Sequence, residues 1–419
     1  MVRGMKPMLR DSYGPREKPR RCKRGIALLA VVLLVDLHAS SVLPMADSER
    51  ISCFVLGKVH VALCPVTGYF EEDPLFTYSL EPIPSGLSDE ERRKYDRLYY
   101  PRTRKILLET YDIMFFSDAR IQHFTPRQYH DLDYSFREAG LPSVWSFGPA
   151  YGQAIENSII HEVLPVSNHN GHYHKNWRVV FRPQQGPVFD PFVELGMERV
   201  IGDGYAFVVP RPGSIVWGDM QPLNTPFLVS WRPGGSQGGL TWVFADEYNQ
   251  LWWGLSSAAR DNNPYAIDMA TNLILYSLDM PLISDISSRR EARRLLSTFR
   301  AQKLLVLSMI EWADNFGANV LDLSDRLTML EDHVDDVLQS YLEQDYPSAI
   351  TIMQSTDKAI LEITGDAIRL KDEALFWVYI SEWMVVTSVA MLTGFIVWTL
   401  MVRRRLYRYV GTTRVQTQF

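Results

Sequence analysis

One long apolar segment near the C-terminus limits what this chain can fold into more than any other feature. Residues 375–402 read LFWVYISEWMVVTSVAMLTGFIVWTLMV, with Glu382 as the one charged side chain. From Trp383 the chain is uncharged for 20 residues, which is enough for one transmembrane helix. The basic run RRRLYR begins at Arg403, and the positive-inside rule places such a flank in the cytoplasm. The pattern predicts a single membrane-spanning helix at 374–402 and a cytoplasmic tail at 403–419.

The N-terminal region, residues 1–44, has the composition of a targeting segment. Residues 1–24 carry nine Lys or Arg and two acidic residues, and the apolar run GIALLAVVLLV follows at 25–35. Eleven residues rise only about 17 Å as a helix, which is short for a membrane span. With the small residues HASS after it, the run is typical of a signal peptide, and an uncleaved short anchor is the alternative. Both ends therefore place the body of the protein outside the cytoplasm.

Charge is divided unevenly along the chain. The formal net charge is −6, yet the N-terminal 24 residues sum to +7 and the five arginines of 403–419 add +5, which leaves −18 for the rest. An acidic body argues against nucleic acid as a partner. The expected partners are the membrane and one or more proteins at the cell surface or in the membrane.

Residues 45–284 alternate between strand-like and helix-like segments. Strands are predicted at Lys58–Val66, Tyr111–Asp118 and Ser143–Gly148, with a capped helix at Thr125–Gly140 between the last two. Two capping boxes are predicted, at Ser88 with Glu91 and at Thr125 with Gln128. Further strands are predicted at Gly213–Gly218, Pro226–Arg232 and Leu240–Asp246, and a final helix at Pro264–Leu278 capped by Asn263. The alternation predicts an α/β ectodomain, layered around a mostly parallel sheet.

Residues 285–373 have the pattern of a helical stalk. Apolar residues recur from Val320 to Tyr341 at alternating spacings of three and four, which is the heptad seam of packed helices or a coiled coil. Similar segments before and after it predict three helices of about 25 residues, and the third leads into the apolar span. Short connections at Gly317 and Pro347 favour a seam internal to one chain, and a dimer interface is the alternative.

Part of the chain resembles a known superfamily. The segments FFSDARIQHFTPRQYHDL, HEVLPV, GSIVWGD and PFLVSWRPGGSQGGLTWVFADE lie in an order that resembles the class I glutamine amidotransferase-like superfamily, in its poorly characterised branch, over residues 112–278. The resemblance implies an amidotransferase-like or flavodoxin-like fold. The membrane tail looks like that of uncharacterised archaeal surface proteins.

The resemblance does not extend to the catalytic residues. Class I enzymes of the superfamily use a Cys on a sharp strand-to-helix turn, with a His and a carboxylate downstream. The matching turn here, FGPAYGQAI after Ser146, holds no Cys, and no His lies between His174 and His333. Glutamine hydrolysis is therefore not expected, and no catalytic residue is assigned.

Three histidines, His169, His172 and His174, lie in the stretch SNHNGHYHKNW. Asn170-Gly171 is a strong two-residue hairpin signal, and a turn there would place all three histidines on one face. Three histidines with an open position suit zinc. The same register puts them on the solvent face of the hairpin, so a protonation-sensitive patch and a surface without a specific role are alternatives. Apart from this possible zinc ion, no cofactor is expected.

A second set of candidates lies where strands end. Asp118 and Asp246 end predicted strands, and with Arg120, Glu247 and Arg260 they are candidates to line a polar ligand crevice. Helix caps or loop salt bridges are the alternative roles for these acids.

Two further pairs of residues are candidates for specific roles. Trp252 and Trp253 form an aromatic loop that can stack on a sugar or a partner residue, or pack in the core. Cys53 and Cys64 are disulfide candidates in an oxidising compartment, and two buried free thiols are the alternative.

These patterns predict a non-catalytic, extracytoplasmic binding or scaffolding subunit of a membrane complex. Two alternatives stay open. One is an auxiliary subunit of an ABC-type transporter. The other is an extracellular hydrolase that depends on a metal at the histidines or on the carboxylates at the strand ends.

Overall fold

The computed structural model describes most of the chain from residue 50 onward. Its described residues are 50–57, 66–82, 87–119, 121–147, 155, 158–182, 186–197, 199–246 and 263–413, and for 168–177, 199–206 and 409–413 the backbone alone is described. The basic N-terminal tail and the predicted signal segment lie outside these ranges.

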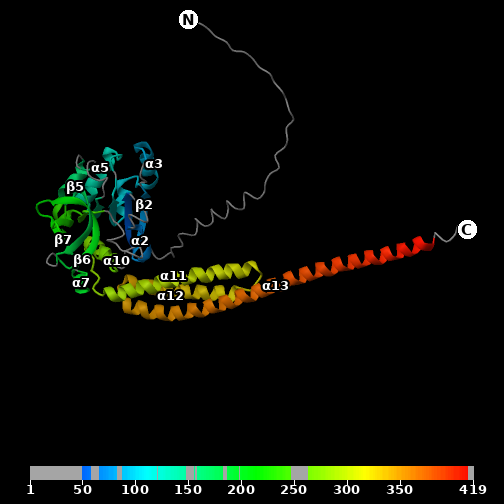
Figure 1. The fold of residues 1–419 in the computed structure, drawn as a ribbon. Helices are drawn as coiled ribbons and strands as arrows, with labels where there is room; N and C mark the ends of the chain where they lie inside the picture. The colour runs from blue at the N-terminus through cyan, green and yellow to red at the C-terminus, as the bar shows by residue number, and fades with distance from the viewer. Residues whose placement is uncertain are drawn as a thin grey trace, which may run out of the picture. The chain divides into compact units, whose positions relative to one another are not determined.

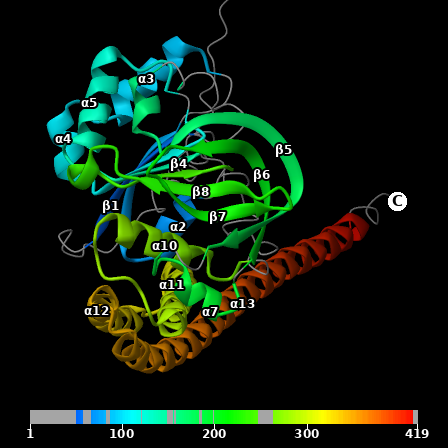
Figure 2. The ribbon, with the colours of Figure 1, turned by 90° about the vertical axis from the view of Figure 1, so that its left-hand side faces the viewer.

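A mixed sheet forms the centre of the α/β domain (Figure 2). It has nine strands, in the order β2-β1-β3-β4-β9-β8-β7-β5-β6. Its first half is parallel and consists of β2 (Phe76–Pro82), β1 (Ile51–Gly57), β3 (Ile113–Ser117), β4 (Ser143–Ser146) and β9 (Thr241–Phe244). All described residues of β3, β4 and β9 are buried. Apolar runs covered on both faces are expected of a parallel sheet flanked by helices.

The second half of the sheet is antiparallel and consists of β8 (Thr225–Trp231), β7 (Ile215–Gln221), β5 (Val166–Phe181) and β6 (Arg199–Pro210). The sheet is therefore parallel only from β2 to β9. The reversal follows from chain connectivity, because the short loop at 232–240 joins β8 to β9 and a connection of that length can join only antiparallel neighbours.

Helices cover this sheet. They are α2 (Val66–Glu72), α3 (Asp89–Tyr99), α4 (Arg104–Thr110), α5 (Pro126–Arg137), α7 (Asp190–Glu194), α10 (Ala266–Ser277) and the 3₁₀ turns η2 (Ile159–Val163) and η3 (Gly235–Gln237). Both predicted capping boxes are present: the Ser88 and Thr125 side chains each accept a hydrogen bond from the backbone three residues on, and Glu91 and Gln128 accept one in return. At α10 the cap residue is Tyr265, and Asn263 accepts a hydrogen bond from its N–H instead.

The first strand of the α/β domain differs from its predicted position. The sequence predicts a strand at Lys58–Val66, but β1 occupies Ile51–Gly57, and Val66 begins helix α2. The physical reason is burial on both faces: β1 lies between β2 and β3, so its run ISCFVLG needs no alternation of polar and apolar residues. Residues 58–65 lie outside the described ranges.

The hairpin predicted at Asn170-Gly171 is also wrong. The backbone continues through both residues as one strand from Val166 to Phe181, where Asn170 is paired with Phe207 and Gly171 with Ala206. The long strand β6 supplies the hydrogen-bonding partner that a local turn would otherwise provide. The register shifts between Gly171 and His174, so the argument that placed three histidines on one face no longer holds.

Three long helices follow the α/β domain: α11 (Ile286–Asn315), α12 (Leu321–Leu342) and α13 (Tyr346–Thr413) (Figure 1). The heptad residues Leu327, Val334 and Tyr341 are buried within the single chain, so in this structure the seam packs inside the bundle. On α13 the matching buried positions recur up to Ala374. Beyond it the helix continues unbroken into an exposed apolar stretch whose length and composition suit a membrane span.

The carboxyl end of β1 tolerates only glycine. Gly57 has φ +128°, and a Cβ atom there would lie 2.2 Å from the carbonyl oxygen of Ser117 on the adjacent strand. Gly57→Ala is expected to lower the free energy of unfolding by about 3 kcal/mol or more, because backbone strain and overlap add. Gly213→Ala is the control, since Gly213 also has positive φ but open space around it, and should cost about 1 kcal/mol. Urea unfolding of both variants tests this, and equal losses would contradict it.

Candidate functional site

The carboxyl ends of the parallel strands meet at one edge of the sheet, where α/β folds bind ligands. Asp118 follows β3 and Asp246 follows β9, and both side chains are buried. Between them, at the end of β4, the Ser146 hydroxyl accepts a hydrogen bond from the Asp118 N–H at 3.1 Å and donates one to the Phe116 carbonyl at 3.4 Å. Asp118 adopts φ +43°, so the chain turns sharply as it leaves the sheet.

The structure brings the two predicted acids to the same edge but not into contact. Strand β4 lies between β3 and β9, which implies a separation of roughly 10 Å, twice the spacing between neighbouring strands. The other predicted crevice residues, Arg120, Glu247, Trp252, Trp253 and Arg260, lie outside the described ranges. A ligand role for Asp118 and Asp246 therefore stays a prediction.

A buried acid pair lies at the same edge, beside β2, and the sequence patterns did not indicate it. Glu81, near the end of β2, and Asp96, on α3, are both buried. His123, which is fully buried in the connection from β3 to α5, places Nε2 2.9 Å from Oδ1 of Asp96. The side chains come from segments far apart in sequence, and each one taken alone looks like an ordinary surface residue.

The acid pair holds a proton at neutral pH. Burial, together with the hydrogen bond to Asp96 and the charge of that carboxylate, raises the pKa of Glu81 to about 9. Neutral Glu81 can donate to Asp96 while the His123 ring donates to the same carboxylate. Burial, followed by the charges of Glu81, Asp131 and Asp96, also raises the pKa of Tyr100 at the end of α3.

This arrangement fits internal support better than chemistry on a substrate. Glu81 and His123 are 0% and 1% exposed, so no substrate atom can approach them in this conformation. A general acid or base must come within hydrogen-bonding distance of the reacting group. The acid pair and His123 therefore act, in this structure, to fix α3 against the edge of the sheet.

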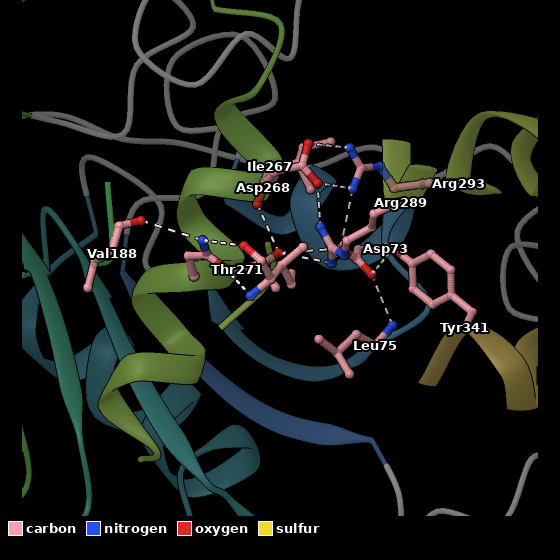
Figure 3. Close-up of polar contacts among 11 residues, drawn as sticks. Asp73, Leu75, Val188, Ile267, Asp268, Thr271, Arg289, Arg293 and Tyr341 are labelled. Carbon is pink, nitrogen blue, oxygen red and sulfur yellow. Dashed lines mark hydrogen bonds and ion pairs between the residues drawn. The ribbon is translucent and has the colours of Figure 1, made fainter. Parts of the chain in front are cut away.

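A second buried polar cluster joins the α/β domain to the helical bundle (Figure 3). Asp73 follows α2, Asp268 lies in the first turn of α10, and Arg289 and Arg293 project from α11. Arg289 bridges both carboxylates, donating to Asp268 and to Asp73. Arg293 forms a two-pronged contact with Asp268 at 2.7 and 2.8 Å.

The second helix of the bundle, α12, completes this cluster, which we call the domain clamp (Asp73, Asp268, Thr271, Arg289, Arg293 and Tyr341). The Tyr341 hydroxyl of α12 donates to Asp73 Oδ1 at 3.1 Å, and the Arg289 guanidinium lies over the Tyr341 ring at 5.6 Å. Both Asp73 and Arg289 are 0% exposed. Two carboxylates balance two guanidiniums, so the cluster is neutral as a whole.

Electrostatics keep Asp268 and Arg289 ionised. Burial alone would raise the pKa of Asp268, but the adjacent guanidiniums of Arg293 and Arg289 outweigh it, and the pKa is lowered. Burial would likewise lower the pKa of Arg289, and the charge of Asp73 outweighs it, so that pKa is raised. Charged hydrogen bonds of this kind are short and directional, which fixes α10 and α11 in one relative position.

A cavity of about 510 Å³ lies beside the domain clamp, between the start of α10 and the first turns of α11. Its lining includes Tyr265, Arg290, Arg293 and Arg294. Arg294 is paired with Glu291 at 2.6 Å, whereas Arg290 lies over the Tyr265 ring at 5.2 Å. Within the described residues, Arg290 has no acidic partner.

Two predicted sites can be compared with the structure only in part. Cys53 is a buried free thiol in β1, and burial raises its pKa. Cys64 lies outside the described residues, so the disulfide stays a prediction. No group of three metal-binding side chains occurs among the residues whose side chains are described. The side chains of His169, His172 and His174 are not among those residues, so the zinc site stays a prediction.

Comparisons with known proteins add little. No protein-family model matches the chain, and no curated protein matches it. Three chains of solved structures match. One of them, reported as the crystal structure of SMU.1228c, is 10% identical with a TM-score of 0.32, and the alignment covers 55% of this chain and 97% of that chain. The resemblance to the amidotransferase-like superfamily therefore stays a prediction.

The acid pair predicts an unusual dependence of stability on pH. Because the pKa of Glu81 is raised from 4.5 to about 9 on folding, the stability it contributes is full below pH 4.5 and is lost as pH rises toward 9. Glu81→Gln keeps a donor to Asp96 without a titrating proton. It should match the parent chain near pH 5 and exceed it by roughly 3 kcal/mol near pH 7.

Urea unfolding of the full chain in detergent, at pH 5 and at pH 7, measures this difference. Glu362→Gln is the control, because Glu362 is exposed on α13 and its replacement should leave the pH dependence unchanged. A constant difference between Glu81→Gln and the parent chain at both pH values would contradict the assignment.

The domain clamp predicts a large asymmetry between two arginines of α11. Arg289→Met leaves Asp73 with only the more distant guanidinium of Arg293, at 3.7 Å, and should destabilise the chain by about 3–5 kcal/mol. Arg294→Met removes a pair in which both side chains are substantially exposed and should cost about 0–1 kcal/mol. Chemical unfolding followed by tryptophan fluorescence compares them, and similar losses would show that the clamp does not carry the stability assigned to it.

Proposed function

We propose that this protein is a non-catalytic binding or scaffolding subunit of a membrane complex, with its α/β domain held outside the cytoplasm. The observation that carries the proposal is the domain clamp together with the continuity of α13. The clamp fixes the α/β domain to the bundle through fully buried charges, and the third helix of that bundle runs unbroken into the apolar segment. Such a connection positions a domain at a membrane.

The positions of the potentially reactive side chains support a non-catalytic role. The turn where the amidotransferase-like resemblance would place its nucleophile holds no Cys. The acid pair and His123 have the side-chain types of a general acid–base site, but they are buried in the core. A scaffold needs a stable shape and a recognition surface, and the buried clusters serve the first of these needs.

The orientation rests on charge. Arg403, Arg404, Arg405 and Arg408 follow the apolar segment directly, which favours a cytoplasmic C-terminus and an external bundle. The acidic body suits a compartment where it meets proteins and lipid rather than nucleic acid.

Recovery of a partner tests the scaffold directly. Crosslinking in intact cells, followed by purification of the full chain in detergent, is expected to yield a membrane protein in fixed stoichiometry. The Arg289→Met variant should recover less of it, because the domain is no longer held in place, while Arg294→Met should recover as much as the parent chain. Recovery of the monomer alone from all three would overturn the proposal.

Cysteine labelling tests the orientation separately. Met329 on α12 is 64% exposed and Tyr407 in the basic tail is 78% exposed. With a membrane-impermeant maleimide on intact cells, Met329→Cys should react at once and Tyr407→Cys only after permeabilisation, each corrected for the parent chain. The opposite result would place the bundle in the cytoplasm.

A further inference from the structure

The connection between α11 and α12 exposes apolar side chains at the far end of the bundle. Phe316 is 48% exposed and Leu321 is 70% exposed. The Trp312 ring, one turn earlier on α11, packs against Phe316 with ring centroids 4.3 Å apart. This group, which we call the hairpin tip (Trp312, Phe316 and Leu321), has no structural need to face water, because the bundle seam is already filled by other residues.

Two contacts place the hairpin tip along α13. Arg326 of α12 pairs with Asp366 of α13 at 2.8 Å, and α12 runs antiparallel to α13. Leu321 is five residues before Arg326, so it lies level with about residue 371 of α13. The Lys371 ammonium lies 6.0 Å from the centre of the Trp312 ring. This contact independently places Trp312 at the level of residue 371.

The pairing between the first two helices agrees with this alignment. Lys303 of α11 contacts Glu331 of α12 at 2.7 Å. Nine residues further along α11 is Trp312, and nine residues back along α12 is Asp322, so Trp312 and Leu321 lie at the same height. Figure 1 shows this end of α11 and α12 beside the middle of α13.

The apolar segment of α13 begins close to the level of the hairpin tip. Leu375 is four residues beyond Lys371, a rise of about 6 Å along the helix. Exposed aromatic residues follow directly: Phe376, Trp377 and Tyr379 are 59%, 61% and 60% exposed. Aromatic side chains of this kind gather at the boundary between lipid and water. The hairpin tip therefore lies within roughly 8–12 Å of the expected interfacial belt of α13.

We propose that the hairpin tip inserts Phe316 and Leu321 into the interfacial region of the same bilayer that α13 crosses. The inference rests on the proposed membrane anchoring and adds a second contact with lipid. The occupant is a lipid surface recognised by apolar burial rather than by anionic headgroups. Exposed acids, Asp314 and Asp322, accompany Arg369 and Lys371 at this level, so the tip has no excess of positive charge.

The second contact has a mechanical consequence. A domain carried by one helix can tilt and rotate about the membrane normal, whereas two points of contact at one surface restrict both motions. Because the domain clamp fixes the bundle to the α/β domain, the restriction passes to the whole external body. The hairpin tip thereby sets the height and the orientation of the α/β domain above the membrane.

Depth-dependent fluorescence quenching tests the inference on the full chain. The chain is reconstituted in phosphatidylcholine vesicles, with an environment-sensitive NBD label at Phe316→Cys and nitroxide-bearing lipids as quencher. Met329→Cys is the matched control, because it is exposed on α12 about 12 Å further from the tip. Val389→Cys, in the apolar segment, reports whether α13 lies in the bilayer at all. The parent chain gives the background from native cysteines.

The expected result is quenching at Phe316→Cys by a shallow nitroxide at least twofold stronger than at Met329→Cys, together with quenching at Val389→Cys by a deep nitroxide. Equal, weak quenching at the first two positions with strong quenching at Val389→Cys would overturn the second contact and leave the anchor intact. Absence of quenching at Val389→Cys would overturn the membrane anchoring, and with it both proposals. Crosslinking of the tip to a protein, without lipid quenching, would assign the surface to a protein partner instead and overturn the inference.

Discussion

The rest of the structure depends on a neutral set of four charges sealed between the α/β domain and the bundle. Removing two carboxylates and two guanidiniums from water is costly, and apolar residues of similar volume often stabilise such a site equally well. Apolar packing, however, does not fix the direction of a contact, whereas charged hydrogen bonds do. Arg289 contacts Asp73 and Asp268 at once, so a slide of α11 by one turn would leave buried charges unpaired. We infer that the domain clamp is retained because it admits only one relative position of the two parts.

The relative position of the α/β domain and the bundle matters because the far end of the bundle leads into the apolar segment of α13. Helix α13 is continuous from Tyr346 to Thr413, and its first half is locked to α11 and α12 by the buried seam that ends at Ala374. A change of tilt in the apolar half therefore cannot be absorbed by a hinge at the junction. It passes into the bundle, and through the domain clamp into the sheet. In the proposed membrane-anchored protein, the orientation of the apolar half of α13 therefore determines the orientation of the α/β domain.

Local signals in the sequence predicted local structure well. The capping boxes at Ser88 and Thr125, the buried strand β3 and the heptad seam of α12 are each encoded within a few residues. Features that depend on distant partners escaped prediction. Tyr341 and Asp73 are 268 residues apart, and nothing in either neighbourhood indicates the other. The Asn170-Gly171 turn failed for the same reason, because its alternative is a pairing with β6 that only the folded sheet supplies.

The buried acid pair also affects which part of the sheet is open to a ligand. The acid pair of Glu81 and Asp96 shares its edge of the sheet with Asp118 and Asp246, the edge that serves ligands in open α/β folds. Here that edge is partly occupied by the protein's own polar contacts: His123 satisfies Asp96, and Ser146 holds the backbone at Asp118. Groups that elsewhere would face a substrate are committed to one another. Under the proposed scaffolding role, the outer surfaces carry recognition, and these buried contacts keep those surfaces in place.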